Sequence, residues 1–391
     1  MPHAEVAGAG LVGLSTALLL RRIGWSVRVH ERSPNVREIG AGISLHQGAC
    51  AVLEHLGLMP AVLAHGVDLG AAQAIDRAGT ILADRNLGGN YRQLAIARQT
   101  LIRLLADAAV AAGVEIETDS RATGARATGE LLLHSGASVR ADLVVGADGF
   151  HSAVRESLRL TARKVERSNG ATRALIEHSK ADRRTVLEEW WGPAKRIGTL
   201  PVGPSLTYVY LSSREADARA VRVPIDGAYW SELFPGMDPV IFEKLSAAEA
   251  RHDPYPYVKP RRWAAGRVAI VGDALNALPP SLGLGASLGL RNARLMVEAL
   301  ATAGHDVPAA LAAWERTARP DTEWVQRWSL FRERLAHDLP APLAAVRSRI
   351  LTRSNGFRGW GRRGRSFDEA LVTGARVHQE HSERPERTVV R

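Results

Sequence analysis

Hydrophobic positions in the first thirty residues follow two different periods. Residues 4–7 and 26–30 form short apolar or alternating runs, whereas residues 11–23 carry apolar side chains at helical spacing and stop before Gly24. This order predicts a strand, a helix and a second strand. Such a unit holds its two strands parallel, because the helix carries the chain back across the sheet. The start of the chain therefore predicts an α/β fold with a parallel sheet.

Later segments show the same periods and, in two regions, a different pattern. The same helical and strand periods predict helices at 99–112, 285–302 and 307–339. They predict strands at 114–118, 142–145 and 267–271, with short strands between 122 and 139. Residues 71–97 and 170–260 instead carry short alternating segments that are rich in Trp and Tyr and broken by Pro and Gly. This second pattern is typical of a mixed β-sheet.

Composition narrows the class of protein. The 391 residues are 46% hydrophobic, which is enough for more than one core. Cys50 is the single cysteine, so no disulfide framework exists, and the thirteen histidines show no metal-ligand spacing. The apolar run at 6–20 lacks a basic flank and is too short to cross a bilayer. We expect a cytoplasmic protein without a metal or a membrane partner.

The formal net charge of +10 raises the alternative of a non-catalytic, nucleic-acid-binding protein. From Arg347 onward there are eleven arginines and five acidic residues, so much of the excess lies in the tail. No nucleic-acid-binding motif accompanies this charge. We therefore expect no nucleic-acid partner, and we expect the charge to steer an anionic substrate or cofactor.

A glycine-rich turn lies between the first strand and the first helix. Gly8 permits the tight turn, Gly10 lets the backbone approach a pyrophosphate, and Gly13 lets the helix pack closely on the sheet. Glu31 follows at the end of the second strand, where a carboxylate can bind both hydroxyls of an adenosine ribose. The combination predicts a dinucleotide site.

Two more motifs follow buried strands. Residues 143–149 end in Asp148–Gly149, and residues 266–274 contain Gly272–Asp273. A strand that ends in Gly-Asp places a carboxylate at the carboxyl edge of the sheet, where ligands bind in such folds. Residues 279–285 then form a Pro- and Gly-rich turn into a helix, whose free N–H groups suit an anionic reduced flavin.

Together the three motifs resemble those of the flavoprotein aromatic hydroxylases, the p-hydroxybenzoate hydroxylase-like group, over residues 4–330. Within the group, the chain is similar to the pyridine-carboxylate oxygenases of the 2-methyl-3-hydroxypyridine-5-carboxylate oxygenase type. Local runs at 4–8, 24–28, 223–226 and 234–235 carry this likeness.

The resemblance implies bound FAD and a set of FAD contacts besides the three glycines. Glu31 is expected at the adenosine ribose, Arg98 near the pyrophosphate, Asp273 at the ribityl chain, and Pro280 at the reacting edge of the flavin. Further contacts are expected at Arg32, Arg37, Ile43, Asp148, Leu282, Gly283, Leu284 and Gly285.

Four substrate-binding residues are implied by the same resemblance. Arg196 and Tyr208, twelve residues apart, match an Arg and Tyr pair, and Tyr255 and Arg173 match a further Tyr and Arg. A guanidinium binds carboxylate or phenolate oxygens, and Tyr supplies a ring wall and a hydroxyl. The alternative interpretation makes Tyr208 and Tyr255 core residues of strands.

The chain also departs from the group. Asn276 stands where His is frequent, Leu284 where Gln is frequent and Asn292 where Asp is frequent, and Ala72 lies near the place of an aromatic pocket residue. FAD binding is expected to survive these changes, which bear on the identity of the substrate.

The expected fold is α/β, with a Rossmann-like FAD-binding domain interleaved with a mixed β-sheet substrate domain, plus C-terminal helices. The FAD-binding domain is assigned to 1–70, 97–168 and 260–340, the substrate domain to 71–96 and 169–259, and a basic tail to 341–391. The oligomeric state is open, and a homodimer is one state that the sequence allows.

The expected reaction is hydroxylation of a small aromatic or N-heteroaromatic acid. NAD(P)H, as co-substrate, reduces FAD, and a flavin C4a-hydroperoxide formed with O2 transfers the hydroxyl group, while the protein orients the substrate and excludes water. No side chain is assigned as catalytic acid or base. A flavin oxidase or reductase of the same fold, without oxygen insertion, is the alternative.

Overall fold

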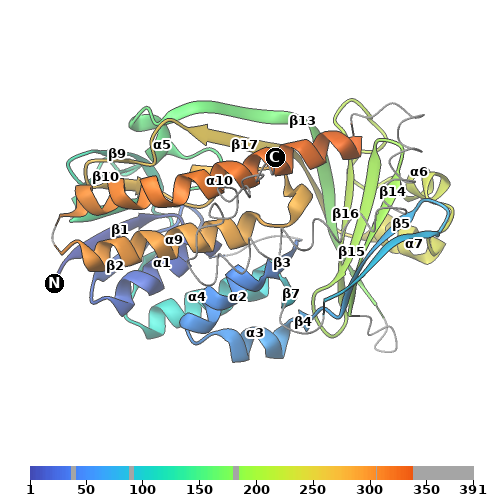
Figure 1. Ribbon diagram of the computed structural model, residues 1–391, viewed down its shortest axis with the longest axis horizontal. Helices are drawn as coiled ribbons and strands as arrows, with labels where there is room; N and C mark the ends of the chain where they lie inside the picture. The colour runs from blue at the N-terminus through green and yellow to red at the C-terminus, as the bar shows by residue number, and fades with distance from the viewer. Residues whose placement is uncertain (37–40, 88–91, 179–184, 305, 338–391) are drawn as a thin grey trace, which may run out of the picture.

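The computed structural model describes residues 1–36, 41–87, 92–178, 185–304 and 306–337. Figure 1 shows a sheet covered by helices at one end of the molecule and a large second sheet at the other. Arg37 and the basic tail at 341–391 lie outside the described residues.

The first sheet has six strands in the order β18-β19-β12-β1-β2-β8, and all but β18 run parallel. Its strands are β1 (His3–Ala7), β2 (Ser26–His30), β8 (Glu115–Glu117), β12 (Leu143–Gly146), β18 (Ala264–Ala265) and β19 (Val268–Ile270). Ala7 pairs with both His30 and Gly146, and Gly146 pairs with Ile270. The parallel sheet predicted from the sequence is confirmed, and the three motifs leave it at the same edge.

Two helices hold this edge together. Val12 of α1 (Leu11–Arg22) packs against Gly272 and against Gly289 of α9 (Gly285–Thr302). A Cβ atom added to Gly272 would lie 3.1 Å from the Val12 side chain, and one added to Gly289 would lie 2.7 Å from it. The helices can pack this closely because both positions lack a side chain. The glycine turn and the Gly-Asp motif are therefore parts of one packed unit.

The second sheet has seven strands in the order β17-β13-β16-β15-β14-β5-β6. They are β5 (Ala71–Asp76), β6 (Ile81–Asn86), β13 (Thr161–Glu177), β14 (Val186–Gly192), β15 (Lys195–Pro201), β16 (Leu206–Arg214) and β17 (Ala250–Pro260). The boundary drawn from the sequence at 168/169 falls inside β13, which is one long strand because it pairs with β17 over most of its length.

The two faces of this sheet differ in polarity. Val209 and Leu211 point into a hydrophobic core that also contains Ile197, Trp230 and Phe234. Side chains alternate along a strand, so the neighbouring positions on β16 belong to the opposite face. That opposite face carries the predicted substrate residues, and on it polar side chains lie beside a smaller hydrophobic cluster that includes Leu175, Leu200 and Tyr208.

Further strands and helices accompany the two sheets. They are β3 (Gly42–His46), β4 (Val67–Asp68), β7 (Gln93–Ala97), β9 (Ala122–Arg126), β10 (Glu130–Leu133), β11 (Ser138–Arg140), α2 (Gln47–His55), α3 (Met59–His65), α4 (Arg98–Ala111), α5 (Ala153–Ser157), α6 (Gly227–Leu233), α7 (Pro239–Ala247), α8 (Asp273–Asn276) and the 3-10 turn η2 (Pro280–Leu282). Strands β3, β7 and β4 form one small sheet, and β11, β10 and β9 form another.

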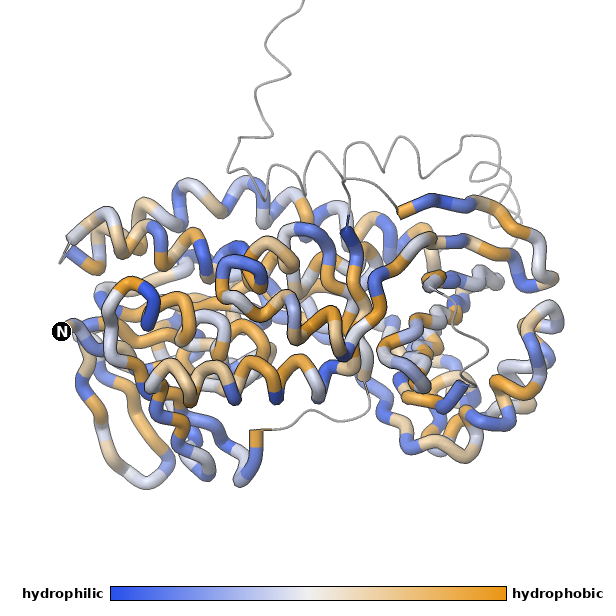
Figure 2. Tube along the Cα trace, turned by 90° about the horizontal axis from the view of Figure 1, so that it is seen from below, coloured by the Kyte–Doolittle hydropathy of each residue, from blue (hydrophilic) through white to orange (hydrophobic). Residues whose placement is uncertain are grey.

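The long helix α10 (Val307–His337) runs beside the first sheet and reaches the second (Figure 1). Near its start, Trp314 packs edge-on against Trp263 with ring centroids 5.1 Å apart. Near its end, buried Glu333 accepts hydrogen bonds from Arg167 and Asn169 of β13. Figure 2 shows hydrophobic and hydrophilic positions alternating along the helices, as one-sided burial requires.

Candidate active site

The glycine turn after β1 has the geometry that each glycine allows. Gly8 has φ +103°, and a Cβ atom there would lie 2.5 Å from the carbonyl oxygen of Ala147. A Cβ atom on Gly13 would overlap the carbonyl oxygen of Gly8, so α1 could not pack as it does. A Cβ atom on Gly10 would meet nothing within 4 Å. The turn therefore leaves open space in front of Gly10, at the amino end of α1.

Glu31 lies beside this turn, directly after β2. Its Oε2 accepts a hydrogen bond from the Ala9 N–H at 3.0 Å, and its Oε1 accepts one from the Ser33 N–H at 3.0 Å. A carboxylate has about four acceptor sites, so two remain for the hydroxyls of a ribose. The structure thus joins the acidic side chain to the glycine turn through Ala9.

The other two acidic residues lie at the same edge of the sheet. Asp148 Oδ2 accepts a hydrogen bond from the Val154 N–H at 3.2 Å, whereas its buried Oδ1 has no hydrogen-bond partner among the described residues. Asp273 is exposed at the first position of α8, after Gly272 with φ +60°. A buried acceptor without a donor is unusual, and a ligand hydroxyl or N–H group would satisfy it.

One extended dinucleotide can reach both outer carboxylates. Glu31 follows β2 and Asp273 follows β19, and only β1 and β12 separate these strands. Three interstrand steps of about 4.8 Å place the two strand ends about 14 Å apart on one edge. The open space at Gly10 and the unsatisfied Asp148 oxygen lie between them, so the residues present fit a nucleotide cofactor such as FAD.

The turn between α8 and α9 borders the same edge. Pro280 is exposed, and a Cβ atom on Gly285 would meet nothing within 4 Å. Leu284 instead turns its side chain into a hydrophobic cluster with Leu278, Leu288 and Val325, next to the partly buried Leu282. Leu284 can therefore offer only its backbone to a ligand. The Gly283 residue has φ +69°, which lets the chain turn into α9.

Three further predicted contacts lie on α4, on β3 and directly after β2. Arg98 is half-buried as the first residue of α4, and its N–H donates to the Ala41 carbonyl at 2.9 Å. Ile43 is half-buried on β3, opposite Ile96 of β7. Arg32 is exposed directly after Glu31.

Arg155 is a residue whose role the sequence reasoning missed. It is fully buried and donates to the carbonyl oxygens of Ala274 at 2.9 Å and Phe150 at 2.7 Å. It therefore ties the Asp148 segment to the Asp273 segment. The sequence showed Arg155 shortly after Asp148, but nothing in its local pattern indicated burial.

The structure brings the four predicted substrate residues onto one face of the seven-stranded sheet. On paired strands, Arg196 lies opposite Ser212 and Arg173 opposite Tyr210, and Tyr208 and Tyr255 belong to the same alternation. Tyr208 also marks the junction with the first half of the molecule. A Cβ atom on Gly42 of β3 would lie 2.5 Å from its Cβ.

Charges on this face are closely coupled. Arg173 forms an ion pair with Asp253 at 2.7 Å. Burial lowers the pKa of Arg173, but Tyr208, Tyr255 and Asp253 more than offset this, so the pKa of Arg173 is raised. Burial also raises the pKa of Tyr208, against the opposing effect of Arg173. Tyr208 therefore keeps its proton at neutral pH and can donate a hydrogen bond.

Arg196 is buried beneath the same face. Its Nη1 atom lies 3.3 Å from Glu189 Oε1, and its guanidinium lies 5.5 Å from the ring centroids of Trp191 and Tyr210. Burial lowers the pKa of Arg196, and the Glu189 carboxylate more than compensates, so the pKa of Arg196 is raised. The Arg196 Nε atom nevertheless lacks a hydrogen-bond acceptor among the described residues.

Tyr255 and Glu189 complete the cluster. Tyr255 is fully buried and donates to Ser212 Oγ at 2.6 Å, which matches the alternative of a structural role more closely than Tyr208 does. Glu189 was missed, although it alternates with Trp191 along β14. Of the adjacent pair, Trp191 lies on the same face as Arg196 and near its guanidinium, and Trp190 belongs to the hydrophobic core on the other face.

The departures noted in the sequence have identifiable places. Ala72 of β5 pairs with Leu187 of β14 and lies on an outer part of the same sheet. Asn292 links α9 to α10, because its Nδ2 donates to Thr322 Oγ1 at 3.1 Å. Asn276 is buried, and its Oδ1 has no partner within the part of the chain that the structure describes.

Neither a metal centre nor a membrane span is found among the described residues. No group of three or more His, Cys, Asp and Glu side chains there is arranged to hold a metal ion. No helix there is both long and apolar enough to cross a membrane.

Comparison with known proteins agrees with this geometry. The family described as FAD binding domain matches residues 3–329. A 2-heptyl-3-hydroxy-4(1H)-quinolone synthase of Mycobacteroides abscessus is 33% identical, with 87% of this chain and 92% of that protein covered. A 3-amino-4-hydroxybenzoate 2-monooxygenase of Streptomyces cremeus is 31% identical, with 86% and 87% covered.

Among solved structures, the tetrameric form of 2-methyl-3-hydroxypyridine-5-carboxylic acid oxygenase is similar to this chain. It has a TM-score of 0.79 and 32% sequence identity, and the match covers 90% of this chain and 93% of that one. The fold, the glycine turn and the three acidic residues at one sheet edge all agree with this relationship. The chain therefore belongs to the FAD binding domain family and is an FAD-dependent monooxygenase of the aromatic hydroxylase type.

Proposed function

We propose that this enzyme hydroxylates a small aromatic or N-heteroaromatic acid of the pyridine-carboxylate kind. In the balanced reaction, one oxygen atom of O2 enters a ring C–H bond as a hydroxyl group. The other oxygen atom leaves as water, with two electrons from NAD(P)H and a proton. FAD, when bound, supplies the redox chemistry that passes these electrons to oxygen.

One observation supports an acidic substrate. Arg196 is 1% exposed, and its Nη1 atom pairs with Glu189 Oε1 at 3.3 Å, whereas its Nε atom has no hydrogen-bond acceptor among the described residues. Buried donors are nearly always satisfied, and a guanidinium is suited to the oxygens of a carboxylate or phenolate. Arg173 and Tyr208 on the same face offer a second cation and a hydroxyl donor. Together they can fix the ring in one orientation.

The chain's own groups have three tasks in this proposal. Arg173 and Arg196 bind the acidic group, and Tyr208 donates a hydrogen bond to a ring substituent. Pro280 lines the side of the site that faces the reacting edge of the flavin. The surrounding buried residues exclude water, which protects the reduced oxygen species from unproductive decay.

The cofactor contacts belong to the same proposal. Glu31 binds the adenosine ribose, Arg98 the pyrophosphate and Asp273 the ribityl chain. Asp148 uses its unsatisfied Oδ1 for a further polar contact. Backbone contacts are assigned to Gly8, Gly10, Gly13, Ile43, Leu282, Gly283, Leu284 and Gly285, and exposed Arg32 supplies a cation near the ribose.

A neutral heteroaromatic such as a 4-quinolone is the second candidate. It is favoured because each guanidinium already has a carboxylate nearby, Asp253 for Arg173 and Glu189 for Arg196. A related quinolone synthase shares 33% of its residues with the chain. The two candidates differ in whether the substrate must carry a negative charge.

The test is a substrate panel of hydroxylated pyridine carboxylates, hydroxybenzoates and 2-alkyl-4-quinolones. NAD(P)H oxidation and the incorporation of one labelled oxygen atom from O2 are measured for each compound. We expect stimulated oxidation and an oxygenated product with an acid. In the Arg173→Met variant, we expect the KM of that acid to rise about tenfold or more, because a charge-assisted hydrogen bond is lost.

The control is Arg219→Met, which removes an exposed guanidinium paired with Asp226 and is expected to leave KM unchanged. A quinolone accepted in preference to every acid selects the second candidate. NAD(P)H oxidation that yields only hydrogen peroxide with all compounds overturns oxygen insertion and supports the flavin oxidase or reductase.

A cytoplasmic location and a homodimer are carried as further parts of this proposal. The supply of NAD(P)H and the single, buried Cys50 fit a reducing compartment. The related pyridine-carboxylate oxygenase has a tetrameric form. Light scattering on the purified chain distinguishes a dimer from a tetramer or a monomer.

A further inference from the structure

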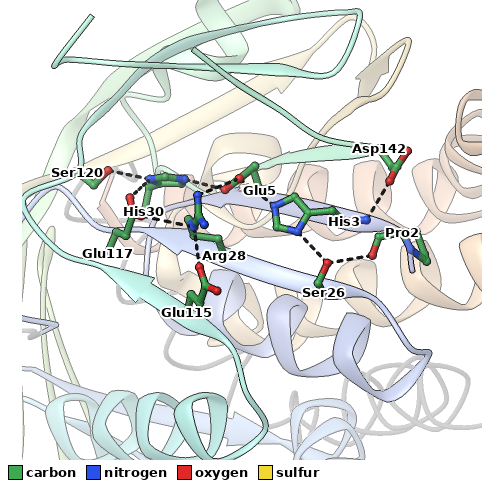
Figure 3. Close-up of polar contacts among 10 residues, drawn as sticks. All are labelled: Pro2, His3, Glu5, Ser26, Arg28, His30, Glu115, Glu117, Ser120 and Asp142. Carbon is green, nitrogen blue, oxygen red and sulfur yellow. Dashed lines mark hydrogen bonds and ion pairs between the residues drawn. The ribbon is translucent and has the colours of Figure 1, made fainter. Parts of the chain in front are cut away.

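A buried polar cluster lies inside the parallel sheet, outside the site described above. Figure 3 shows the His30 ring between Glu5 and Ser120, and the His3 ring between Glu5 and Ser26. The side chains of Glu5 and His30 are 1% and 0% exposed. A carboxylate on the central strand of such a sheet requires partners, because an isolated buried charge is costly.

Hydrogen bonds connect Glu5, His30 and Ser120 in that order. Glu5 Oε2 lies 2.7 Å from His30 Nε2, and His30 Nδ1 lies 2.7 Å from Ser120 Oγ. Burial raises the pKa of Glu5, and its hydrogen bonds to His30 and His3 outweigh this, so the pKa of Glu5 is lowered. An ionised Glu5 only accepts hydrogen bonds, so His30 Nε2 carries the proton and donates.

This chain of contacts ends on the backbone around Glu31. The Ser120 N–H donates to the Glu31 carbonyl at 2.8 Å, and the Glu31 N–H donates to the Glu117 carbonyl at 2.8 Å. The His30 carbonyl accepts a hydrogen bond from the Gly8 N–H at 2.8 Å. His30 and Ser120 therefore brace Glu31 from both sides, and they connect it to the glycine turn.

We propose that His30 and Ser120 are positioning residues for the adenosine half of FAD. The chain Glu5–His30–Ser120 fixes the backbone of Glu31, so that its carboxylate meets the ribose hydroxyls without further rearrangement. This inference rests on the role proposed above for Glu31.

The expected size of the effect follows from one hydrogen bond. A net loss of about 0.5–1.5 kcal/mol for an ordinary hydrogen bond corresponds to about a two- to tenfold change in affinity. A displaced Glu31 would weaken contacts with the ribose while leaving the flavin ring in its place. The affinity for FAD and the spectrum of bound flavin therefore report on different parts of the site.

The experiment titrates FAD into the apo form of the full chain for the Ser120→Ala, Ser120→Thr and His30→Gln variants. We expect Ser120→Ala and His30→Gln to raise the Kd for FAD about three- to tenfold. Ser120→Thr keeps the hydroxyl and is expected to stay within about twofold of the unaltered chain. At saturating FAD, the visible absorption of the bound flavin is expected to be unchanged in all three.

The matched control is Ser26→Ala at the other end of the cluster. Ser26 Oγ lies 2.9 Å from His3 Nδ1, at the start of β2 and far from the ligand edge. Its loss removes a hydrogen bond of the same network and is expected to leave the Kd unchanged. An equal rise in Ser26→Ala, an unchanged Kd in Ser120→Ala, or an altered flavin spectrum in the variants overturns the positioning role.

A further variant separates this inference from the proposed site. If Glu31→Gln leaves the Kd for FAD unchanged, the ribose role of Glu31 fails and the positioning role fails with it. If Glu31→Gln weakens FAD binding while Ser120→Ala and His30→Gln do not, only the positioning role fails. If Ser120→Ala does not fold, the Kd of His30→Gln for FAD tests the positioning role in its place.

Discussion

At the scale of the residue, two buried arginines show how hydrogen-bond satisfaction separates scaffold from site. In Arg155 the Nε, Nη1 and Nη2 atoms each donate a hydrogen bond, to Thr161, Ala274 and Phe150. Arg196 is equally buried, but its Nε lacks an acceptor among the described residues, and its Nη1 meets only the Glu189 carboxylate at 3.3 Å. A fully satisfied buried cation holds segments of chain together, whereas an unsatisfied one is suited to a ligand.

The pH dependence of stability follows from Glu189. Burial raises its pKa, and the Arg196 and Arg332 guanidiniums with the Tyr210 hydroxyl outweigh this, so its pKa lies below the usual 4.5. The ionised carboxylate therefore stabilises the fold above about pH 4.5, and this stabilisation is lost as the pH falls through the lowered value. In Glu189→Gln we expect a loss of about 3 kcal/mol at neutral pH, because two buried cations lose their carboxylate.

The melting temperatures of the unaltered protein and of Glu189→Gln are measured from neutral pH to about pH 3. The difference between the two is expected to shrink below about pH 4.5. Glu130→Gln, which breaks the more exposed pair with Arg126, is the control and is expected to change stability by less than about 1 kcal/mol. A difference that is constant with pH contradicts the assignment.

At the scale of the element, the turn between β1 and α1 divides its tasks among its glycines. Gly8 and Gly13 are required by the protein itself, since a Cβ atom at either position would meet backbone atoms. Gly10 is not, because a Cβ atom there meets nothing and its φ of −78° suits other residues. The absence of a side chain at Gly10 therefore serves the ligand and not the fold.

Two alanine substitutions separate these tasks. Gly10→Ala is expected to leave the stability of the apo form nearly unchanged and to weaken FAD binding about tenfold or more, because its methyl group occupies the space in front of the turn. Gly13→Ala is expected to destabilise the apo form by about 1–3 kcal/mol, since α1 must move away from Gly8. Thermal melts without FAD and titrations with FAD measure both effects. Equal effects of the two substitutions on apo stability would contradict the division.

At the scale of the whole molecule, α10 joins the two halves. Its first turns pack on the parallel-sheet half through Trp314 and Trp263, and its last turns bind β13 through Glu333. Between them, Ser329 donates to the carbonyl of Pro279 in the turn that borders the flavin site. The helix therefore holds the turn and the substrate face in one arrangement.

Removing the Glu333 charge tests this coupling. Glu333 is 0% exposed and binds Arg167 at 3.0 Å, so Glu333→Gln is expected to cost about 3 kcal/mol. Because the lost contact lies between the halves, we expect calorimetry to show two separated unfolding transitions instead of one. Glu298→Gln, in an exposed pair on α9, is the control and is expected to keep one transition. A single, merely lowered transition in Glu333→Gln would argue against the coupling role.

The sequence alone determined the elements with strong local periods. The helix predicted at 285–302 is α9 (Gly285–Thr302), and the strand predicted at 26–30 is β2 (Ser26–His30). It did not reveal β3, α2 or α3, which are short and lack a sustained period. The glycine turn and Glu31 could also be predicted from the sequence. The turn and the end of the second strand are close in sequence, and one strand–helix–strand unit fixes their spacing.

Only the tertiary structure decided which side chains share the substrate face. Arg173, Arg196, Tyr208 and Tyr255 come from four strands, and the alignment of those strands depends on long-range pairing that no local pattern encodes. The pairing of Arg196 with Glu189, the burial of Arg155 and the contact of His30 with Glu5 have the same origin. Local periodicity follows from the geometry of one segment, whereas burial and charge pairing depend on which distant segments pack against it.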